Sequence, residues 1–421
     1  MRAAAGSPST RRRQRAAKPH IERPLAQEIV ARLGEMRPWL REHQAAAEQQ
    51  RRIPQETIER LDAAGLFSLT KPERFGGADF TTRELHDIYR ALGAGCGASA
   101  WMVWAAAGGN LWSCAFDDEV VAPVYESTWV GNRTFALGGT SRRMSGKAWK
   151  VDGGWMIKGV WPFATGSVHA SHGYLAVFYD DTDDAKVGMA LVPKDALISR
   201  DDWDAMGLAG TGSQTVATDG DLFVPDERFS TPAHLAARIE ELTAQGRGPR
   251  RGGLPRSLVT CTGVALGMAD HAMELFLGAI DKRGIPYSPY AKQADAPITH
   301  LTVGRAYAQI RAAGRVADAA VAELDRCETE GVDPSAREGV QLHTDAAYVW
   351  DACSSAIETL FHASGASAII KRQPLQLIAR NCRAGSMHAA HNIDTWVENI
   401  GRMLCGVESA PQSMNVLERR S

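Results

Sequence analysis

The sequence predicts a mostly α-helical protein with a small antiparallel β domain in the middle of the chain and a four-helix bundle after it. Two observations carry this prediction. Helical periodicity fills the stretches on both sides of residues 129–232. Between them, alternating apolar and polar residues flank a tight turn at Asp152-Gly153. The chain has 421 residues, which is long for one core and suits two or three domains.

Residues 23–128 are expected to form an N-terminal helical domain. Residues 26–49 carry apolar side chains at helical spacing, and Pro54 favours the start of a second helix. Thr81 or the threonine after it can cap a third helix, which we expect to reach about residue 92. Residues 98–116 are apolar on almost all sides, which predicts a buried helix.

Residues 129–232 are expected to form the β domain. The clearest local signal is a hairpin in which Ala148–Val151 and Trp155–Lys158 flank the turn. Further strands are expected at residues 174–179, 187–192 and 220–224.

Residues 233–256 contain several glycines and arginines, which predicts a linker or an exposed loop. Residues 257–410 are expected to form the four-helix bundle, followed by a tail at 411–421. The expected helices are residues 257–283, 296–330, 334–364 and 374–405. Asp333-Pro334 is typical of a helix start, and Gly331 and Gly365 are typical of helix ends.

Residues 1–22 are expected to be a disordered basic leader. The first 20 residues include six basic side chains and no acid, and they lack the apolar core of a secretory signal. A solvated tail is favoured over a nucleic-acid-binding arm, since the remaining chain is acidic, with 41 basic and 49 acidic residues. Seven dispersed cysteines without a Cys-x-x-Cys pair indicate a reducing cytoplasm. No apolar run is long enough to span a membrane.

Four stretches, in this order, carry a resemblance to a known family: residues 53–77, 151–166, 207–228 and 373–388. Together they make the chain similar to the acyl-CoA dehydrogenase superfamily from about Pro24 to Gly406. Within it, the chain looks most like two-component flavin-dependent monooxygenases, the oxygenase components of the p-hydroxyphenylacetate hydroxylase and natural-product hydroxylase type. The resemblance implies an acyl-CoA dehydrogenase-like fold and a homotetramer with flavin sites at the subunit borders.

The resemblance also implies the activity and its partners. Reduced FMN, with FAD as the alternative, would come from a separate NAD(P)H:flavin reductase. With O2 it would form a C4a-hydroperoxide that hydroxylates an aromatic or polycyclic small molecule. An amino-sugar N-oxygenase of the nitrososynthase type, an acyl-CoA dehydrogenase-type flavin oxidoreductase and a non-catalytic flavin-binding protein are the alternatives. A dehydrogenase needs a carboxylate base, and residues 381–396 contain no glutamate and one acid, Asp394.

The segment 161–166 is expected to contact the flavin ring. The residues of the expected contact are Trp161, Phe163, Ala164, Thr165 and Gly166. The Thr165 hydroxyl matches the family position that holds the proton on flavin N5; the alternative is a hydroxyl that satisfies backbone groups at a strand end. Trp161 and Phe163 would be walls, or else core aromatics. Thr211 and Ser213 could contact flavin, although turn chemistry also explains them.

Two histidines are candidates for the catalytic base, because deprotonation makes a phenolic substrate a better nucleophile. His388 matches the family position, and His391 follows three residues later. No third ligand accompanies them, so no metal is expected. For substrate binding we expect Trp101 and Asn110, with core packing as the alternative for Trp101.

A cation is needed for the flavin phosphate. Arg283 matches the family position, Lys282 is adjacent, and a solvated charge at a helix end is the alternative. One departure from the family pattern is Arg380-Asn381, where the family often has Arg-Asp. An asparagine cannot supply the negative charge that would pair with Arg380.

Overall fold

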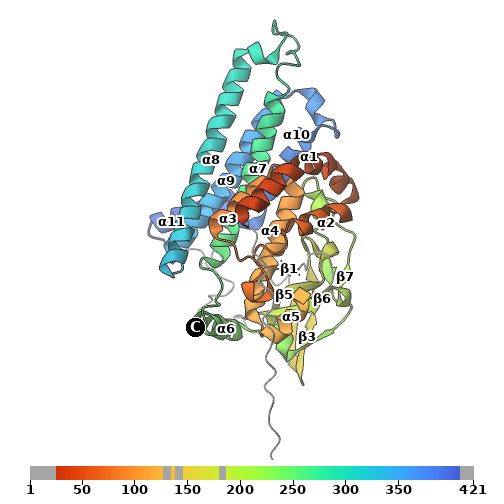
Figure 1. Cartoon of the computed structure of the whole chain (residues 1–421), viewed down its shortest axis with the longest axis vertical. Helices are drawn as coiled ribbons and strands as arrows, with labels where there is room; N and C mark the ends of the chain where they lie inside the picture. The colour runs from red at the N-terminus through yellow and green to blue at the C-terminus, as the bar shows by residue number, and fades with distance from the viewer. Residues whose placement is uncertain (1–24, 127–133, 138–145, 180–185, 408–421) are drawn as a thin grey trace, which may run out of the picture.

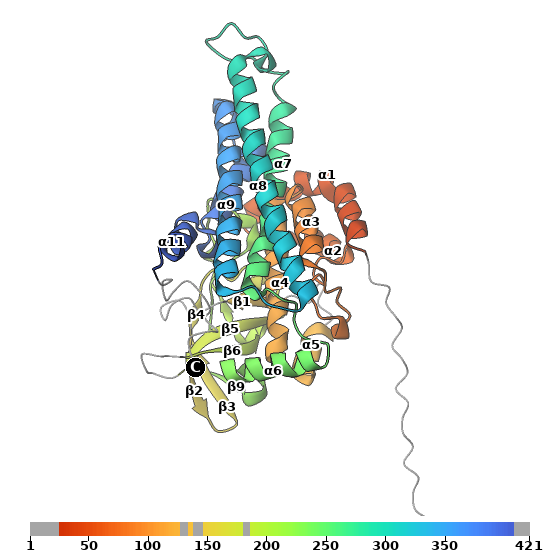
Figure 2. The same ribbon diagram turned by 90° about the vertical axis from the view of Figure 1, so that its left-hand side faces the viewer.

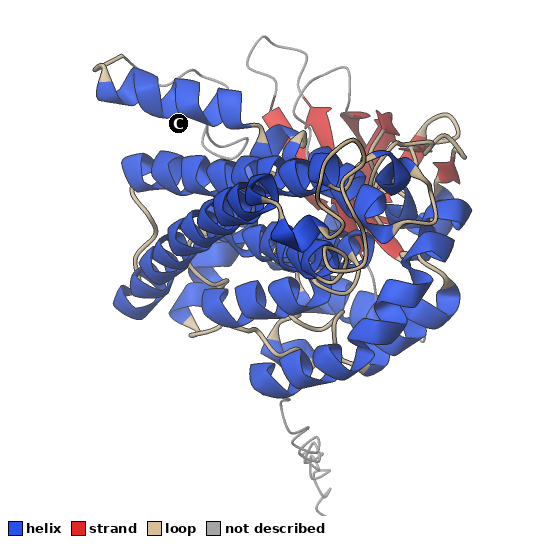
Figure 3. Ribbon diagram, turned by 90° about the horizontal axis from the view of Figure 1, so that it is seen from above, coloured by secondary structure: helices blue, strands red, loops and turns tan. Residues whose placement is uncertain are grey.

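The computed structural model describes residues 25–126, 134–137, 146–179 and 186–407. The predicted leader and the predicted tail lie outside these ranges. Long helices form one end of the molecule and a β-sheet region the other, with the N-terminal helices between and beside them (Figure 1). Figure 3 shows the strands gathered at one side of the helices. The predicted mostly helical fold with a central β region is confirmed.

The N-terminal region is helical, as predicted. Its helices are α1 (Ala26–Gln50), α2 (Gln55–Ala63), α3 (Thr82–Gly93), α4 (Gly97–Leu111) and α5 (Asp118–Glu126). Thr81 caps α3: its hydroxyl accepts from the Glu84 N–H, and the Glu84 carboxylate accepts from the Thr81 N–H. The interior helix α4 is buried along most of its length, which fits its apolar sequence.

The strands form two sheets among the described residues. One contains β1 (Thr134–Leu137), β2 (Gly146–Val151), β3 (Gly154–Lys158), β5 (His172–Tyr179), β6 (Lys186–Pro193), β9 (Leu222–Pro225) and β10 (Phe229–Ser230). The other contains β4 (Val160–Trp161), β7 (Ile198–Ser199) and β8 (Val216–Ala217). The predicted hairpin is confirmed: β2 pairs antiparallel with β3, with Val151 opposite Gly154 and Gly153 at φ 72° in the turn.

The prediction of a purely antiparallel sheet is wrong. Both β1 and β2 pair with β5 in parallel. The hairpin signal specifies only the pairing of neighbouring segments, whereas these pairs join strands separated by long connections. The sheet is therefore mixed, with β5 between β2 and β6.

The predicted linker contains a helix, α6 (Pro232–Ala244). Thr231 caps it by accepting from the His234 N–H, and Pro232 occupies the first turn. Leu235 and Leu242 are buried on its inner face. The glycines that suggested a loop lie after this helix.

The C-terminal region contains α7 (Gly253–Leu277), α8 (Pro297–Glu330), α9 (Ala336–Ala363), α10 (Pro374–Ser386) and α11 (Ile393–Leu404). Figure 2 shows α7, α8 and α9 running side by side. Asp333 is not the cap of α9, since Ser335 and Glu338 form a capping box there. Asp333 instead accepts from the Gly252 N–H at 2.9 Å. None of the described helices is both long enough and apolar enough to cross a membrane.

The predicted helix at 374–405 is interrupted, and the interruption carries the candidate histidines. His388 has an extended backbone and its Nδ1 accepts from the Ala390 N–H at 3.2 Å. A short 3-10 helix, η9 (Ala389–His391), follows, and Asn392 caps α11. Side chains that bond their own backbone in this way compete with a continuous helix. Consequently the two histidines do not lie three residues apart on one α-helical face.

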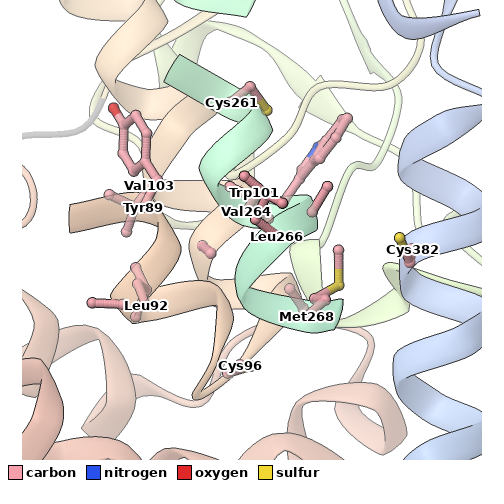
Figure 4. Packing of buried hydrophobic residues seen from close by; sticks show 14 of the residues in the cluster. Tyr89, Leu92, Cys96, Trp101, Val103, Cys261, Val264, Leu266, Met268 and Cys382 are labelled. Atoms are coloured by element: carbon pink, nitrogen blue, oxygen red, sulfur yellow. The ribbon is translucent and has the colours of Figure 1, made fainter. Parts of the chain in front are cut away.

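Close backbone contacts join the N-terminal helices to the bundle. A Cβ at Gly263 would lie 2.4 Å from the His86 carbonyl oxygen, and one at Gly267 would lie 2.2 Å from that of Arg90. The two glycines therefore let α7 lie directly on α3. Figure 4 shows part of the resulting core, including Val264, Met268 and Trp101. This core fixes the position of α4, which borders the candidate site.

Candidate active site

The segment after β4 turns sharply, and its side chains separate into buried and exposed ones. Phe163 has φ 61°, a left-handed conformation that is costly for a residue with a side chain, and 58% of its surface is exposed. Its ring meets the edge of Trp203 at 5.9 Å between centroids. Gly166 also has positive φ, and a Cβ there would lie 3.3 Å from Met102 of α4. An exposed aromatic ring on a strained backbone is typical of a ligand contact.

The side chain of Trp161 does not reach this surface. It is fully buried in the core of the β region, and its Nε1 donates to the Ala176 carbonyl at 2.9 Å. Its expected role as a flavin wall is therefore wrong for this chain, since no part of the ring is accessible. Ala164 is also fully buried, and its N–H donates to the Gln214 carbonyl.

The Thr165 hydroxyl begins a row of three hydroxyl groups. Its Oγ1 lies 2.7 Å from the Ser213 Oγ, which lies 2.7 Å from the Thr211 Oγ1. Thr211 donates to the Leu208 carbonyl at 2.7 Å. Thr165 is half-buried, whereas Ser213 and Thr211 are buried. The row thus runs from the segment 163–166 into η5 (Ala209–Thr211).

The loop that carries these hydroxyls is fixed to α10. The Leu208 N–H donates to the Asn381 Oδ1 at 2.7 Å, in a buried contact. A Cβ at Gly207 would lie 2.1 Å from the Arg380 carbonyl oxygen, so only glycine permits this approach. Arg380 pairs with Glu48 and donates to the Met206 carbonyl. Glu48 therefore supplies the negative charge for Arg380 that Asn381 lacks. Asn381 instead holds the loop by accepting the Leu208 N–H.

A cluster of aromatic rings contains both candidate histidines. Trp101 of α4 lies edge-on to Trp350 of α9 at 5.5 Å, to His388 at 5.4 Å and to His391 at 5.7 Å between centroids. Its ring is tilted by 59° against that of Trp104, at 5.0 Å. His391 is fully buried and stacks on Trp350 at 5.0 Å. Trp101, which was expected to face the substrate or else to pack in the core, contacts both histidines and is part of the core.

The two histidines differ in their surroundings. His391 has no solvent contact, and burial holds the pKa of its ring well below the usual range. The side chain of His388 is exposed on one side and crowded by rings on the other. Burial against these rings lowers the pKa of His388 to about 4. Both rings are neutral at pH 7, and His388 is the one that an incoming molecule can reach.

No metal site accompanies the histidines. Within the residues that the structure describes, no group of three His, Cys, Asp or Glu side chains could hold a metal ion.

Arg283 lies far from the other candidates within one chain. The connection between α7 and α8 lies at the end of the bundle opposite the sheet (Figure 1). There the Arg283 guanidinium donates to the Ser364 carbonyl at 3.0 Å and to the side chains of Ser364 and Gln293. Partial burial lowers its pKa, and the group stays charged. Arg283 thus lies in the connection at the end of the bundle opposite the sheet, whereas Thr165 follows β4 in the β region.

Asn110 is occupied by structural contacts. Its Nδ2 donates to the Thr70 hydroxyl and its Oδ1 accepts from the Tyr125 hydroxyl, both at 3.4 Å. It is buried nine residues from Trp101 on α4, which is about 13 Å along a helix. Asn110 therefore lies apart from the cluster around His388, and its contact with substrate stays a prediction.

Sequence reasoning missed Trp104 and Trp350. Trp104 is half-buried, and its Nε1 donates to the Ser257 carbonyl. Trp104 could have been found from its spacing of three residues after Trp101, which places both on neighbouring positions of one helix face. Trp350 gave no such signal, because it reaches the cluster from a helix 249 residues further along the chain.

Comparison with known proteins gives two family matches and several relatives of similar length. The family model "Acyl-CoA dehydrogenase, N-terminal domain" matches residues 26–114, and "Acyl-CoA dehydrogenase, C-terminal domain" matches residues 259–393. A flavin-dependent monooxygenase, oxygenase subunit HsaA, from Rhodococcus jostii is 29% identical over 369 residues, which cover 86% of this chain and 94% of that one.

Two further similarities extend over almost the whole chain. The oxygenase component of an FADH2-dependent resorcinol hydroxylase from a Rhizobium species is 27% identical over 410 residues, covering 94% of this chain and 97% of that one. The solved structure of XiaF from a Streptomyces species, in complex with FADH2 and glycerol, superimposes with a TM-score of 0.83 at 26% identity. That match covers 91% of this chain and 96% of XiaF.

Proposed function

This chain belongs to the acyl-CoA dehydrogenase family, and from that premise we propose that it is a reduced-flavin-dependent monooxygenase that hydroxylates an aromatic small molecule. The relatives that span most of its length are named as oxygenase subunits or components of flavin-dependent hydroxylases. A separate enzyme therefore supplies the reduced flavin. The structural support is the position of His388 among tryptophan rings, where a neutral base faces apolar, aromatic surroundings.

The alternative dehydrogenase chemistry has less support. It needs a carboxylate that takes a proton next to a thioester. The one acid in residues 381–396 is Asp394, which is exposed in the first turn of α11. Because Asp394 is exposed to solvent, it lacks the water-excluded surroundings that this chemistry needs.

The residues of the segment 163–166 fit a flavin ring. The exposed Phe163 ring offers an apolar face, and the half-buried Thr165 hydroxyl offers a polar contact at the edge of the same loop. Reduced flavin, when bound there, supplies the electrons that activate O2. The chain's part is to hold the ring, to exclude water and to position the substrate.

His388 would remove the proton of a phenolic substrate. Its lowered pKa keeps the ring neutral at pH 7. In this state Nδ1 accepts from the Ala390 N–H and Nε2 carries the ring proton, so a substrate must replace the Ala390 bond before Nδ1 can take its proton. Trp101 and Trp104 meet its ring edge-on and would hold an aromatic substrate beside it.

The position of Arg283 supports a role across a subunit border. Its guanidinium is charged, but it belongs to the connection between α7 and α8, at the end of the bundle opposite the sheet (Figure 1), whereas Thr165 follows β4. A second copy could bring its own Arg283 to the flavin phosphate, with several copies forming the homotetramer expected from the family.

The test is isotope incorporation. The purified chain is mixed with an NADH-driven flavin reductase, FMN or FAD, ¹⁸O2 and a panel of phenols, and products are analysed by mass spectrometry. One ¹⁸O atom in a hydroxylated phenol supports the proposal. Reduction of bound flavin by acyl-CoA in the absence of O2, without ¹⁸O in any product, would contradict it.

A further inference from the structure

The direction of the hydrogen bonds in the hydroxyl row can be derived from its last member. The Leu208 carbonyl has no proton to give, so at 2.7 Å the Thr211 hydroxyl must donate to it. If that proton pointed elsewhere, two oxygen atoms would face each other at 2.7 Å with no hydrogen between them. The single proton of Thr211 is thus committed to the carbonyl.

The direction of this bond determines the directions of the other two in the row. Because a hydroxyl has one proton and two lone pairs, Thr211 can only accept from Ser213, 2.7 Å away. Ser213 has then used its own proton and can only accept from Thr165, at 2.7 Å. The Thr165 hydroxyl therefore donates inward, and it presents lone pairs alone to a molecule outside the row.

The end of the row is held firmly. Leu208, a non-glycine residue, has φ 53°, and the Asn381 Oδ1 accepts its N–H at 2.7 Å. The Leu208 carbonyl also accepts from the Trp203 Nε1 at 3.2 Å and from the Thr211 N–H at 3.0 Å. This carbonyl is thus fixed in place by the loop and by α10, so the polarity of the row is set by buried groups.

An acceptor-only hydroxyl distinguishes the two redox forms of flavin. Reduced flavin carries a hydrogen on N5 and can donate it, whereas N5 of oxidised flavin is an acceptor and requires a donor. We propose that Ser213 and Thr211 are positioning residues that fix the Thr165 hydroxyl as an acceptor, so that the site binds reduced flavin in preference to oxidised flavin. The inference rests on the proposed function, since it takes Thr165 to face the flavin.

The test compares dissociation constants for oxidised and reduced FMN, measured under anaerobic conditions, in the full chain and its variants. Ser213→Ala frees the Thr165 proton to point outward. Thr211→Val lets Ser213 donate to Thr165 and has the same result. Each variant should bind oxidised FMN about tenfold more tightly, the effect of one neutral hydrogen bond on an equilibrium. Reduced FMN should bind nearly as before.

Thr262→Val is the matched control. Thr262 is a buried threonine on α7, and its hydroxyl donates to the Val259 carbonyl three residues earlier at 2.6 Å, as Thr211 does to Leu208. The control should lose similar stability without changing the ratio of the two dissociation constants. Because the expected effect in the row is a gain in affinity, a damaged fold cannot imitate it.

The outcomes separate this inference from the proposed function. If the unaltered chain prefers reduced FMN and neither variant gains affinity for oxidised FMN, the polarity of the row does not set the preference. Equal binding of both forms by the unaltered chain also overturns the inference, while leaving the monooxygenase proposal standing. If neither FMN nor FAD binds in either form, the proposed function fails and the inference fails with it.

Discussion

The ring of His391 lies nearly parallel to the indole of Trp350, with centroids 5.0 Å apart and planes inclined by 21°. This stacking closes His391 inside the protein, where burial keeps its ring neutral. His388 lies 5.4 Å away and retains an exposed side. Of the two candidate bases, His388 is therefore the one to which a substrate has access.

We expect His388→Ala to slow hydroxylation of a phenol by about 100-fold or more, the usual contribution of a general base. Reoxidation of reduced flavin should continue, since the base acts on the substrate. Rapid mixing of enzyme, reduced flavin and O2, with hydrogen peroxide and product measured separately, checks both statements. His391→Leu, which replaces a buried ring by an apolar side chain of similar size, should keep most of the turnover. The reverse pattern would assign the base to His391.

The buried histidines make folding stability depend on pH. Burial lowers the pKa of His271 to about 4 and lowers that of His343 and His391 as well. In the unfolded chain these rings take up protons near pH 6.5, which the folded chain cannot do. Stability is therefore complete above pH 6.5 and falls as the pH drops below it, by up to about 1.4 kcal/mol per pH unit for each histidine.

Urea denaturation at pH 7.5, 6.0 and 5.0 measures this dependence. Carboxylates with a lowered pKa, such as Glu274, do not contribute to the change in this pH range. Their stabilisation is lost only at more acidic pH, as the pH falls through the pKa of the folded state. In the variant His343→Leu the loss of stability between pH 6.0 and 5.0 should be smaller than in the unaltered chain. A free energy of unfolding that stays constant across the window would show that the histidines remain accessible to protons.

The strand-to-loop change at residues 161–163 shows where sequence reasoning succeeds and where it ends. The resemblance to the family singled out residues 161–166, and the alternation of apolar and polar residues predicted the hairpin before them. In an extended strand, Trp161 and Phe163 would lie on the same face. The backbone of Phe163 instead has a φ of 61°, which is not an extended conformation, and one ring is buried while the other is exposed. Such a conformation is rare outside glycine and leaves no trace in the sequence.

The cluster around the two histidines could not be predicted from the sequence either, for a different reason. The tryptophans and histidines come from α4, α9 and η9, and the packing of α7 on α3 and α9 decides that they meet. No local pattern encodes such distant contacts. The break in the last predicted helix was missed because the His388 side chain stabilises a local turn that periodicity does not register.

The backbone strain at Phe163 gives a prediction that separates stability from binding. Both Phe163→Gly and Phe163→Ala remove the exposed ring, but only glycine adopts φ 61° without steric cost. The glycine variant should be more stable than the alanine variant by about 1 kcal/mol. Both should bind reduced FMN more weakly than the unaltered chain, to a similar degree. Denaturation and anaerobic titration test the two parts, and unchanged binding in both variants would remove the Phe163 ring from the flavin site.

The role of Arg283 can be tested by removing the phosphate from the ligand as well as the cation from the protein. If a neighbouring copy's Arg283 holds the flavin phosphate, Arg283→Ala should weaken binding of reduced FMN by about tenfold or more, as expected for a charge-assisted hydrogen bond. Binding of reduced riboflavin, which has no phosphate, should change little.

Lys282→Ala is the control, since Lys282 is adjacent and exposed. A variant that binds both ligands equally poorly would instead indicate that Arg283 acts through its bonds to Ser364 and Gln293, which join the end of α7 to the end of α9. Equal loss in Lys282→Ala would assign the phosphate contact to the general positive charge at this helix end.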